Sequence, residues 1–251
     1  MRCFIGIDLG STTTKAVVLA EDRRILGRGI TNSRSNYDTA ATVAKQEALV
    51  SARFELFREA LARSGALNGK LEEFIGHLER DFRLEQFLEQ LADLEATCQR
   101  NARGPRFGDA AAGVALALTE LFRRLREDSP ALFIPNAKRK SDFFRDIAGA
   151  QYLALGEAVA KDAGVRYDML LNVYDRSIIE VENREYGDAI RRNLLAAMDR
   201  TLRAMPEAAS RSDKIRAPIQ GVLDMDLEET YVVGTGYGRA DRKSTRLNSS
   251  H

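Results

Sequence analysis

The chain has 251 residues, of which 44% are hydrophobic and 30% are charged. This apolar fraction is typical of globular proteins and excludes a disordered chain, and the length suits one domain or two small ones. Lysine and arginine total 38 against 37 acidic residues, so the basic excess of a nucleic-acid or anionic-membrane binder is missing. No run of about 18 apolar residues occurs, so we expect no membrane span.

The few cysteines and histidines exclude other classes of site. Cys3 and Cys98 lie far apart in the sequence, and two thiols cannot alone complete a four-ligand zinc or iron–sulfur site. This cysteine usage, without a secretory leader, predicts a cytoplasmic protein. His77 is the only histidine before the last residue, and no nucleophile elbow accompanies it, which excludes a Ser-His-Asp hydrolase.

The pattern of apolar residues predicts a sheet interrupted by a large helical insertion. Residues 3–8, 13–20 and 25–30 are predicted strands separated by turn residues, and residues 230–234 are a strand that rejoins the first sheet. Between them the apolar residues follow the helical period. We predict helices over 40–63, 71–94, 110–126, 142–163 and 188–205, and the pattern of 168–174 is ambiguous.

The segment Asp8-Leu9-Gly10-Ser11-Thr12-Thr13-Thr14-Lys15 carries the most chemistry. Backbone amides of a tight turn and Ser/Thr hydroxyls bind phosphate, a lysine neutralises its charge, and a carboxylate holds magnesium through water. The pattern is not a Walker loop, because Thr14 stands where that motif has its second glycine. From the residues alone, a polar β-turn without a ligand is an equal alternative.

A second glycine-rich segment, Gly234-Thr235-Gly236-Tyr237-Gly238, follows the last predicted strand. It does not match the dinucleotide-binding pattern, because Arg239 occupies the position of the third glycine. Glycines at the end of a strand allow a ligand to approach the backbone closely. We therefore expect Gly234 and Gly236 to lie at a binding site.

Residues 4–17, Phe-Ile-Gly-Ile-Asp-Leu-Gly-Ser-Thr-Thr-Thr-Lys-Ala-Val, resemble the first phosphate motif of the actin, Hsp70 and sugar-kinase ATPase superfamily. More narrowly, they and the segment Val233-Gly-Thr-Gly-Tyr-Gly-Arg239 are similar to the activator ATPases of benzoyl-CoA reductase and 2-hydroxyacyl-CoA dehydratase. The long insertion resembles that of the large ATP-binding subunit of the reductase. The resemblance implies an α/β fold, a partial actin-like ATPase lobe with a large all-helical insertion.

The resemblance also implies ligands and roles. Asp8 would position Mg²⁺ through water and Lys15 would neutralise the phosphates of ATP; both are the implied catalytic residues. The family's second phosphate motif, adenosine segment and [4Fe-4S] cysteines are expected outside this chain, so the implied cluster belongs to a longer protein and the chain itself is expected to be inactive. The implied phosphate-binding residues are Gly10, Ser11, Thr12, Thr13, Thr14, Gly234 and Gly236.

The expected domains follow the same resemblance: an ATPase lobe at 1–36, a helical insertion at 37–222 and a returning strand at 223–240. Residues 241–251 resemble a translated sequencing adapter, so we expect a non-native tail. The implied partners are a second ATPase subunit, the substrate-reducing subunits and reduced ferredoxin, with neither nucleic acid nor membrane. Two alternatives stay open: an activator ATPase of a 2-hydroxyacyl-CoA dehydratase, and a non-catalytic helical interaction module.

Overall fold

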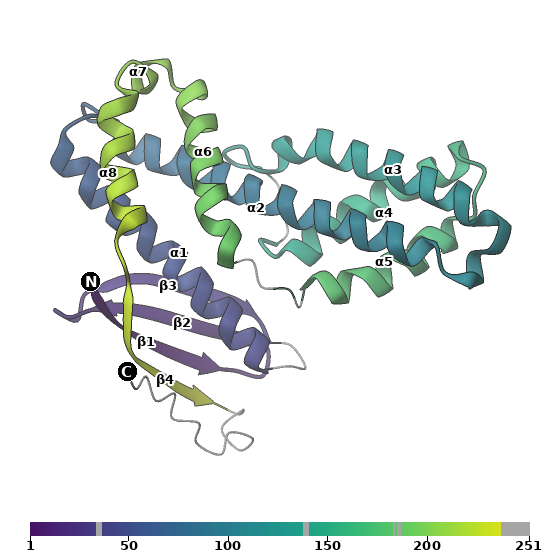
Figure 1. Cartoon of the computed structure of the whole chain (residues 1–251), viewed down its shortest axis with the longest axis horizontal. Coiled ribbons are helices and arrows are strands. Elements are labelled where there is room, and N and C mark those ends of the chain that lie inside the picture. The colour runs from purple at the N-terminus through teal and green to yellow at the C-terminus, as the bar shows by residue number, and fades with distance from the viewer. Residues whose placement is uncertain (34–36, 138–140, 183, 185–186, 237–251) are drawn as a thin grey trace. The chain divides into compact units, whose positions relative to one another are not determined.

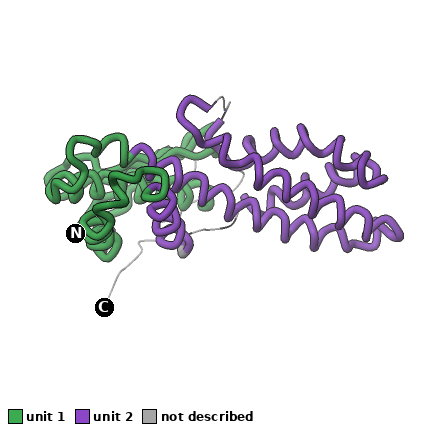
Figure 2. Tube along the Cα trace, turned by 90° about the horizontal axis from the view of Figure 1, so that it is seen from above, with its two compact units in different colours: residues 1–75, 202–251 green, residues 76–201 purple. Residues whose placement is uncertain are grey.

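The structure is a computed structural model (Figure 1) and divides into two compact units (Figure 2). Unit 1 comprises residues 1–75 and 202–251, and unit 2 comprises residues 76–201. The expected domain boundaries at residues 37 and 223 are of a different kind, because they separate an ATPase lobe from a helical insertion. They stay a prediction. The described residues are 1–33, 37–137, 141–182, 184 and 187–236, so the expected tail at 241–251 lies outside them.

Unit 1 is built on a four-stranded mixed sheet in the order β3-β2-β1-β4. The three predicted strands that open the chain form a meander, with β1 and β2 antiparallel and β2 and β3 antiparallel. The fourth strand pairs with β1 in parallel, which requires a long crossover, and the helices between β3 and β4 supply it. The strands are β1 (Arg2–Leu9), β2 (Thr13–Ala20), β3 (Ile25–Asn32) and β4 (Glu228–Gly236).

One face of the sheet is covered by α1 (Tyr37–Ser64), which packs against β3 and β2 (Figure 1). The contact is close because glycines of β3 meet small residues of α1. A Cβ atom on Gly29 would overlap the Ala44 carbonyl oxygen and lie 2.5 Å from the Ala48 nitrogen. Both alanines are fully buried. Two further helices of unit 1 follow later in the chain, α7 (Pro206–Ala209) and α8 (Ser212–Asp224), and α8 packs against α1.

The opposite face of the sheet carries apolar side chains that are open to solvent. Phe4 of β1 stacks on Tyr231 of β4, with ring centroids 6.2 Å apart. Ile30 of β3 and Val233 of β4 are 50% and 60% exposed. Because side chains alternate along a strand, Phe4 and Asp8 share this face. The charged end of the first hairpin is therefore accessible on the open face.

Unit 2 is helical and has a core of its own. Phe122, Tyr152 and Leu91 are among its largest fully buried side chains. The Tyr152 hydroxyl donates to the Leu170 carbonyl oxygen at 2.9 Å, which satisfies the buried phenol. The helices are α2 (Leu71–Ala102), α3 (Ala111–Asp128), α4 (Phe144–Asp162), α5 (Tyr167–Glu182) and α6 (Ile190–Ala204), of which α2 begins and α6 ends in unit 1. Short 3-10 helices span Pro105–Ala110, Ser129–Leu132 and Gly187–Ala189.

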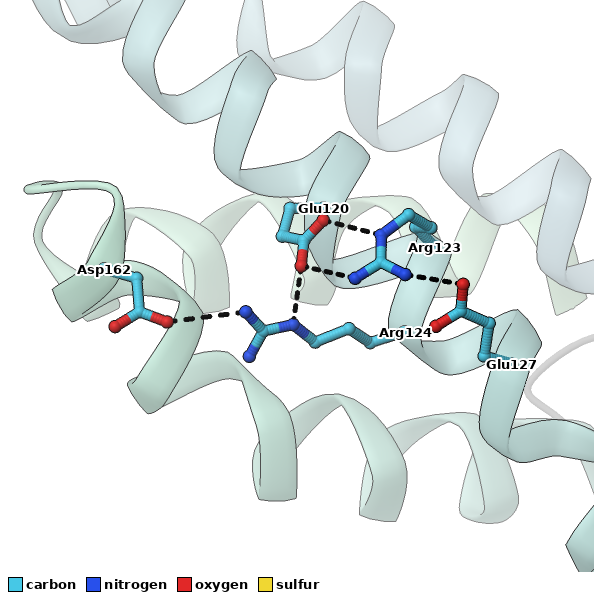
Figure 3. A network of polar contacts seen from close by, with 5 residues as sticks. All are labelled: Glu120, Arg123, Arg124, Glu127 and Asp162. Atoms are coloured by element: carbon cyan, nitrogen blue, oxygen red, sulfur yellow. Dashed lines mark hydrogen bonds and ion pairs between the residues drawn. The ribbon is translucent and has the colours of Figure 1, made fainter.

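The charged residues of α3 pair with one another on the surface of unit 2 (Figure 3). Glu120 accepts hydrogen bonds from Arg123 and from Arg124, each at 2.7 Å. Arg123 also pairs with Glu127, and Arg124 with Asp162 of α4. The two guanidinium donors lower the pKa of Glu120 to about 2. Each of these exposed pairs contributes little to stability. Together they provide hydrogen-bond partners for the charged groups on the exposed side of α3, whose other side is buried.

This architecture confirms the predicted fold class, an α/β protein with a mixed sheet and a large all-helical part, and it is consistent with an actin-like ATPase lobe. The four strands and the five helices occur where the sequence pattern predicts them, but α2 continues to Ala102, whereas its predicted end is residue 94. The ambiguous residues 168–174 belong to α5. The pattern did not reveal α8, which contains Pro218 in its interior, a residue that normally ends a helix.

Candidate functional site

The candidate site lies at the turn between β1 and β2. The strands pair up to Leu9 and Thr14, and the residues between them form the turn. Gly10 is required there, because a Cβ atom at this position would lie 2.6 Å from the Thr13 carbonyl oxygen. Within the described residues, the backbone amides of Ser11 and Thr12 donate to no backbone carbonyl. The turn therefore offers free N–H donors, as an anion-binding nest does.

Three polar side chains form a row across the sheet beside this turn. Asp8 of β1 is directly opposite Lys15 of β2 on one side and Thr235 of β4 on the other. All three residues are exposed. The Thr235 hydroxyl donates to Asp8 Oδ1 at 3.2 Å. Lys15 takes part in no ion pair with a described residue, so its ammonium group is available to an external anion.

Thr14 has a different position from its neighbours. It is fully buried on the α1 side of the sheet, and its hydroxyl oxygen lies 3.1 Å from Ser33 Oγ. Ser33 Oγ donates to the Gly10 carbonyl oxygen at 2.5 Å, and the Ser33 N–H donates to the Thr12 carbonyl oxygen at 2.8 Å. Because the Ser33 hydroxyl has one proton, Thr14 is the donor of their shared bond. Thr14 and Ser33 thus brace the turn from its buried side.

The remaining residues of the predicted site lie close by. Thr13 is partly buried and is two residues from Lys15, so both point to the same face of β2. Gly236 has a φ of 113°, and a Cβ atom there would overlap the Leu9 carbonyl oxygen, so a glycine is needed beside the end of β1. Gly234 has open space around it. Tyr237, Gly238 and Arg239 of the second motif lie outside the described residues.

These side chains fit the phosphates of a nucleotide and its magnesium ion. Lys15 supplies a cation without an acidic partner among the described residues, and the turn supplies amides and the hydroxyls of Ser11 and Thr12. Asp8 supplies an exposed carboxylate, the oxygen ligand that magnesium and its water shell accept. The arrangement can therefore hold a charged phosphate on one side and a hydrated cation on the other.

The residues do not fit an iron–sulfur cluster. Cys3 is in unit 1 and Cys98 is in unit 2, and both thiols are buried. Burial raises the pKa of Cys3, and it raises the pKa of Cys98 to about 12, whereas a cluster ligand is a thiolate. In the described part of the chain, no group of three or more His, Cys, Asp or Glu side chains is placed to hold a metal ion.

The sequence did not reveal two residues that contact the candidate site. Ser33 belongs to a polar linker, and no motif marks it as a brace for the turn. Thr235 lies within the second glycine-rich segment, but its place beside Asp8 depends on the parallel register of β1 and β4. That register joins residues 227 positions apart, so pattern alone could not reveal the contact.

Of the comparisons with known proteins, one gives a match, and it identifies a family. No curated protein and no solved structure matches the chain. No helix within the described ranges is long and apolar enough to cross a membrane. The model of the BadF/BadG/BcrA/BcrD ATPase family matches residues 5–248, which include the turn, both units and part of the expected tail. The chain therefore belongs to the BadF/BadG/BcrA/BcrD ATPase family.

Proposed function

We propose that the chain is the ATP-binding subunit of a benzoyl-CoA reductase-type complex, which couples ATP hydrolysis to low-potential electron transfer for the reduction of an aromatic acyl-CoA. The observation that carries the proposal is Lys15, which has no acidic partner among the described residues, beside exposed Asp8 at a glycine turn whose amides donate to no described backbone carbonyl. In a family of ATPases this is the arrangement expected for nucleotide phosphates. A cytoplasmic location belongs to the same proposal.

Lys15 and Asp8 have distinct tasks in this proposal. Lys15 and the amides of Ser11 and Thr12 bind the phosphates, and electrostatic stabilisation of this kind acts on charge that develops in phosphoryl transfer. Asp8 orients the water shell of the magnesium ion, which neutralises phosphate charge when it is bound. Hydrolysis then shifts the balance between two conformations, because one conformation binds ATP better and the other binds ADP better.

The helical unit 2 supports the reductase over the dehydratase activator. In the sequence, unit 2 is part of the long segment between β3 and β4. In the dehydratase activators that the sequence resembles, a short helical segment joins the corresponding strands. We propose that the chain works with a second ATPase subunit and with the substrate-reducing subunits, and that reduced ferredoxin supplies the electron. Because Cys3 and Cys98 do not fit a cluster, the [4Fe-4S] cluster of this proposal is held by cysteines outside the chain.

Calorimetric titration with Mg²⁺ and ATP tests the site. We expect Lys15→Ala and Asp8→Ala to weaken binding, because each removes a charge that faces the ligand. Lys161→Ala and Asp175→Ala remove the same charges from exposed positions of unit 2 and are matched controls that should bind as the unsubstituted chain does. Unchanged affinity in both site variants would refute the phosphate site.

Sequencing of the source locus past codon 240 tests the finer proposal. We expect the reading frame to continue into a second glycine-rich phosphate motif and then a pair of closely spaced cysteines. A frame that ends at His251 would contradict the electron-activating role, and the interaction module would then be the better account.

A further inference from the structure

The hydroxyl of Thr235 has no part in the roles assigned so far, although it contacts the carboxylate that faces the metal. Thr235 is in register with Asp8 on the neighbouring parallel strand, and its Oγ1 donates to Asp8 Oδ1 at 3.2 Å. On its other side, Asp8 is opposite Lys15, but the two form no ion pair. Thr235 is therefore the side chain that restrains the Asp8 carboxylate in the described structure.

We propose that Thr235 is a positioning residue for Asp8, and this inference rests on the proposed function. An exposed aspartate rotates freely about its side-chain bonds, and freezing that rotation on binding costs free energy. The donated bond occupies Oδ1 and leaves Oδ2 free to accept from a water molecule of the magnesium shell. Residues that orient a metal-facing carboxylate in this way typically change metal affinity 10- to 100-fold when they are removed.

A purely structural role for this hydroxyl is less consistent with its surroundings. Thr235 is exposed, and so are its strand neighbours Gly234 and Gly236, so its methyl group has little to pack against. The end of β4 is set beside β1 by the ladder and by Gly236, whose Cα approaches the Leu9 backbone too closely for any side chain. Removal of the hydroxyl should therefore leave the strand in place and free the carboxylate.

The test compares Thr235→Val, which keeps the shape and removes the hydroxyl, with Thr235→Ser, which keeps the hydroxyl and removes the methyl group. Val233→Thr is the control, because it changes an exposed residue on the same face of β4 that does not adjoin Asp8. Binding of ATP is measured by calorimetry at increasing Mg²⁺ concentrations and again in EDTA, and the unfolding midpoint of each variant is recorded without ligand.

We expect Thr235→Val to raise the Mg²⁺ concentration needed for half-maximal binding about tenfold, with unchanged ATP binding in EDTA and an unchanged unfolding midpoint. Thr235→Ser should restore the Mg²⁺ dependence, and Val233→Thr should not alter it. Equal Mg²⁺ dependence in Thr235→Val and the unsubstituted chain would overturn this inference and leave the proposed function intact. The inference would also be overturned if Thr235→Ser needed as much Mg²⁺ as Thr235→Val does. It would be overturned as well if Thr235→Val weakened ATP binding in EDTA as much as it does with Mg²⁺. Absence of Mg²⁺-dependent binding in the unsubstituted chain would overturn both.

Discussion

Substitution of Gly29 by alanine should destabilise unit 1 by separating α1 from β3. The added Cβ atom would lie 2.5 Å from the Ala48 nitrogen, whereas ordinary contacts begin at 3.4 Å. The Ala44 carbonyl oxygen and the Ala48 nitrogen, which face this Cβ atom, both belong to the backbone of α1. Neither can rotate away as a side chain could, so the helix must retreat by about 1 Å. Overpacking of this kind costs about 1–3 kcal/mol.

Native-state amide hydrogen exchange measures this effect within unit 1, where a global unfolding signal would mix both units. We expect amides of α1, β2 and β3 in Gly29→Ala to exchange roughly tenfold faster or more, since about 1.4 kcal/mol is a tenfold change in equilibrium constant. Gly234→Ala is the matched control, because it is a strand glycine of the same sheet with open space around it. Equal exchange in the two variants would refute the close packing of α1 on β3.

Three further predictions concern unit 2. Because burial raises the pKa of Cys98 to about 12, this thiol should resist a thiol reagent at about pH 8 until the chain unfolds. Glu120 has a folded pKa of about 2, below its usual value of about 4.3; its contribution to stability should be present above that usual value and lost as the pH falls towards 2. Tyr152→Phe removes the bond to the Leu170 carbonyl and should cost about 1 kcal/mol.

Each of these has a contradicting result. Labelling of Cys98 in the folded chain, followed by mass spectrometry, would contradict its burial. For Glu120, hydrogen exchange of unit 2 amides in Glu120→Gln and in the unsubstituted chain should differ slightly at neutral pH and converge in acid, and a constant difference would contradict the arginine pairing. For Tyr152, unchanged exchange of unit 2 amides in the Phe variant would mean that the hydroxyl bond contributes nothing.

The fold was largely predictable from the sequence because its elements obey simple periodicities. The strands of the first hairpin flank turn residues, and the long helices repeat apolar residues on one side. Helix α8 was missed because Pro218 reads as a helix breaker, whereas burial of Ile215, Ile219 and Val222 stabilises the helix around it. Tertiary packing thus decided a segment for which local propensity was unfavourable.

The candidate site was predictable in part. The turn glycine and the charged pair, Asp8 and Lys15, stand out in the sequence because they are close together and chemically distinctive. Other features depend on which face of the sheet a residue occupies and on strand register. These are the burial of Thr14, its hydrogen bond to Ser33 and the contact of Thr235 with Asp8. A shift of one residue in register would move each of them to the other face, and local sequence does not specify a register across most of the chain.

The most direct test of the account is a map of the Mg²⁺–ATP site by NMR of the ¹⁵N-labelled chain. We expect amide shifts to concentrate at residues 8–15 and at Thr235, and to be lost in Lys15→Ala while Lys161→Ala retains them. Shifts that concentrate in unit 2, or that persist in Lys15→Ala at the same ligand concentration, would contradict a phosphate site at the first hairpin.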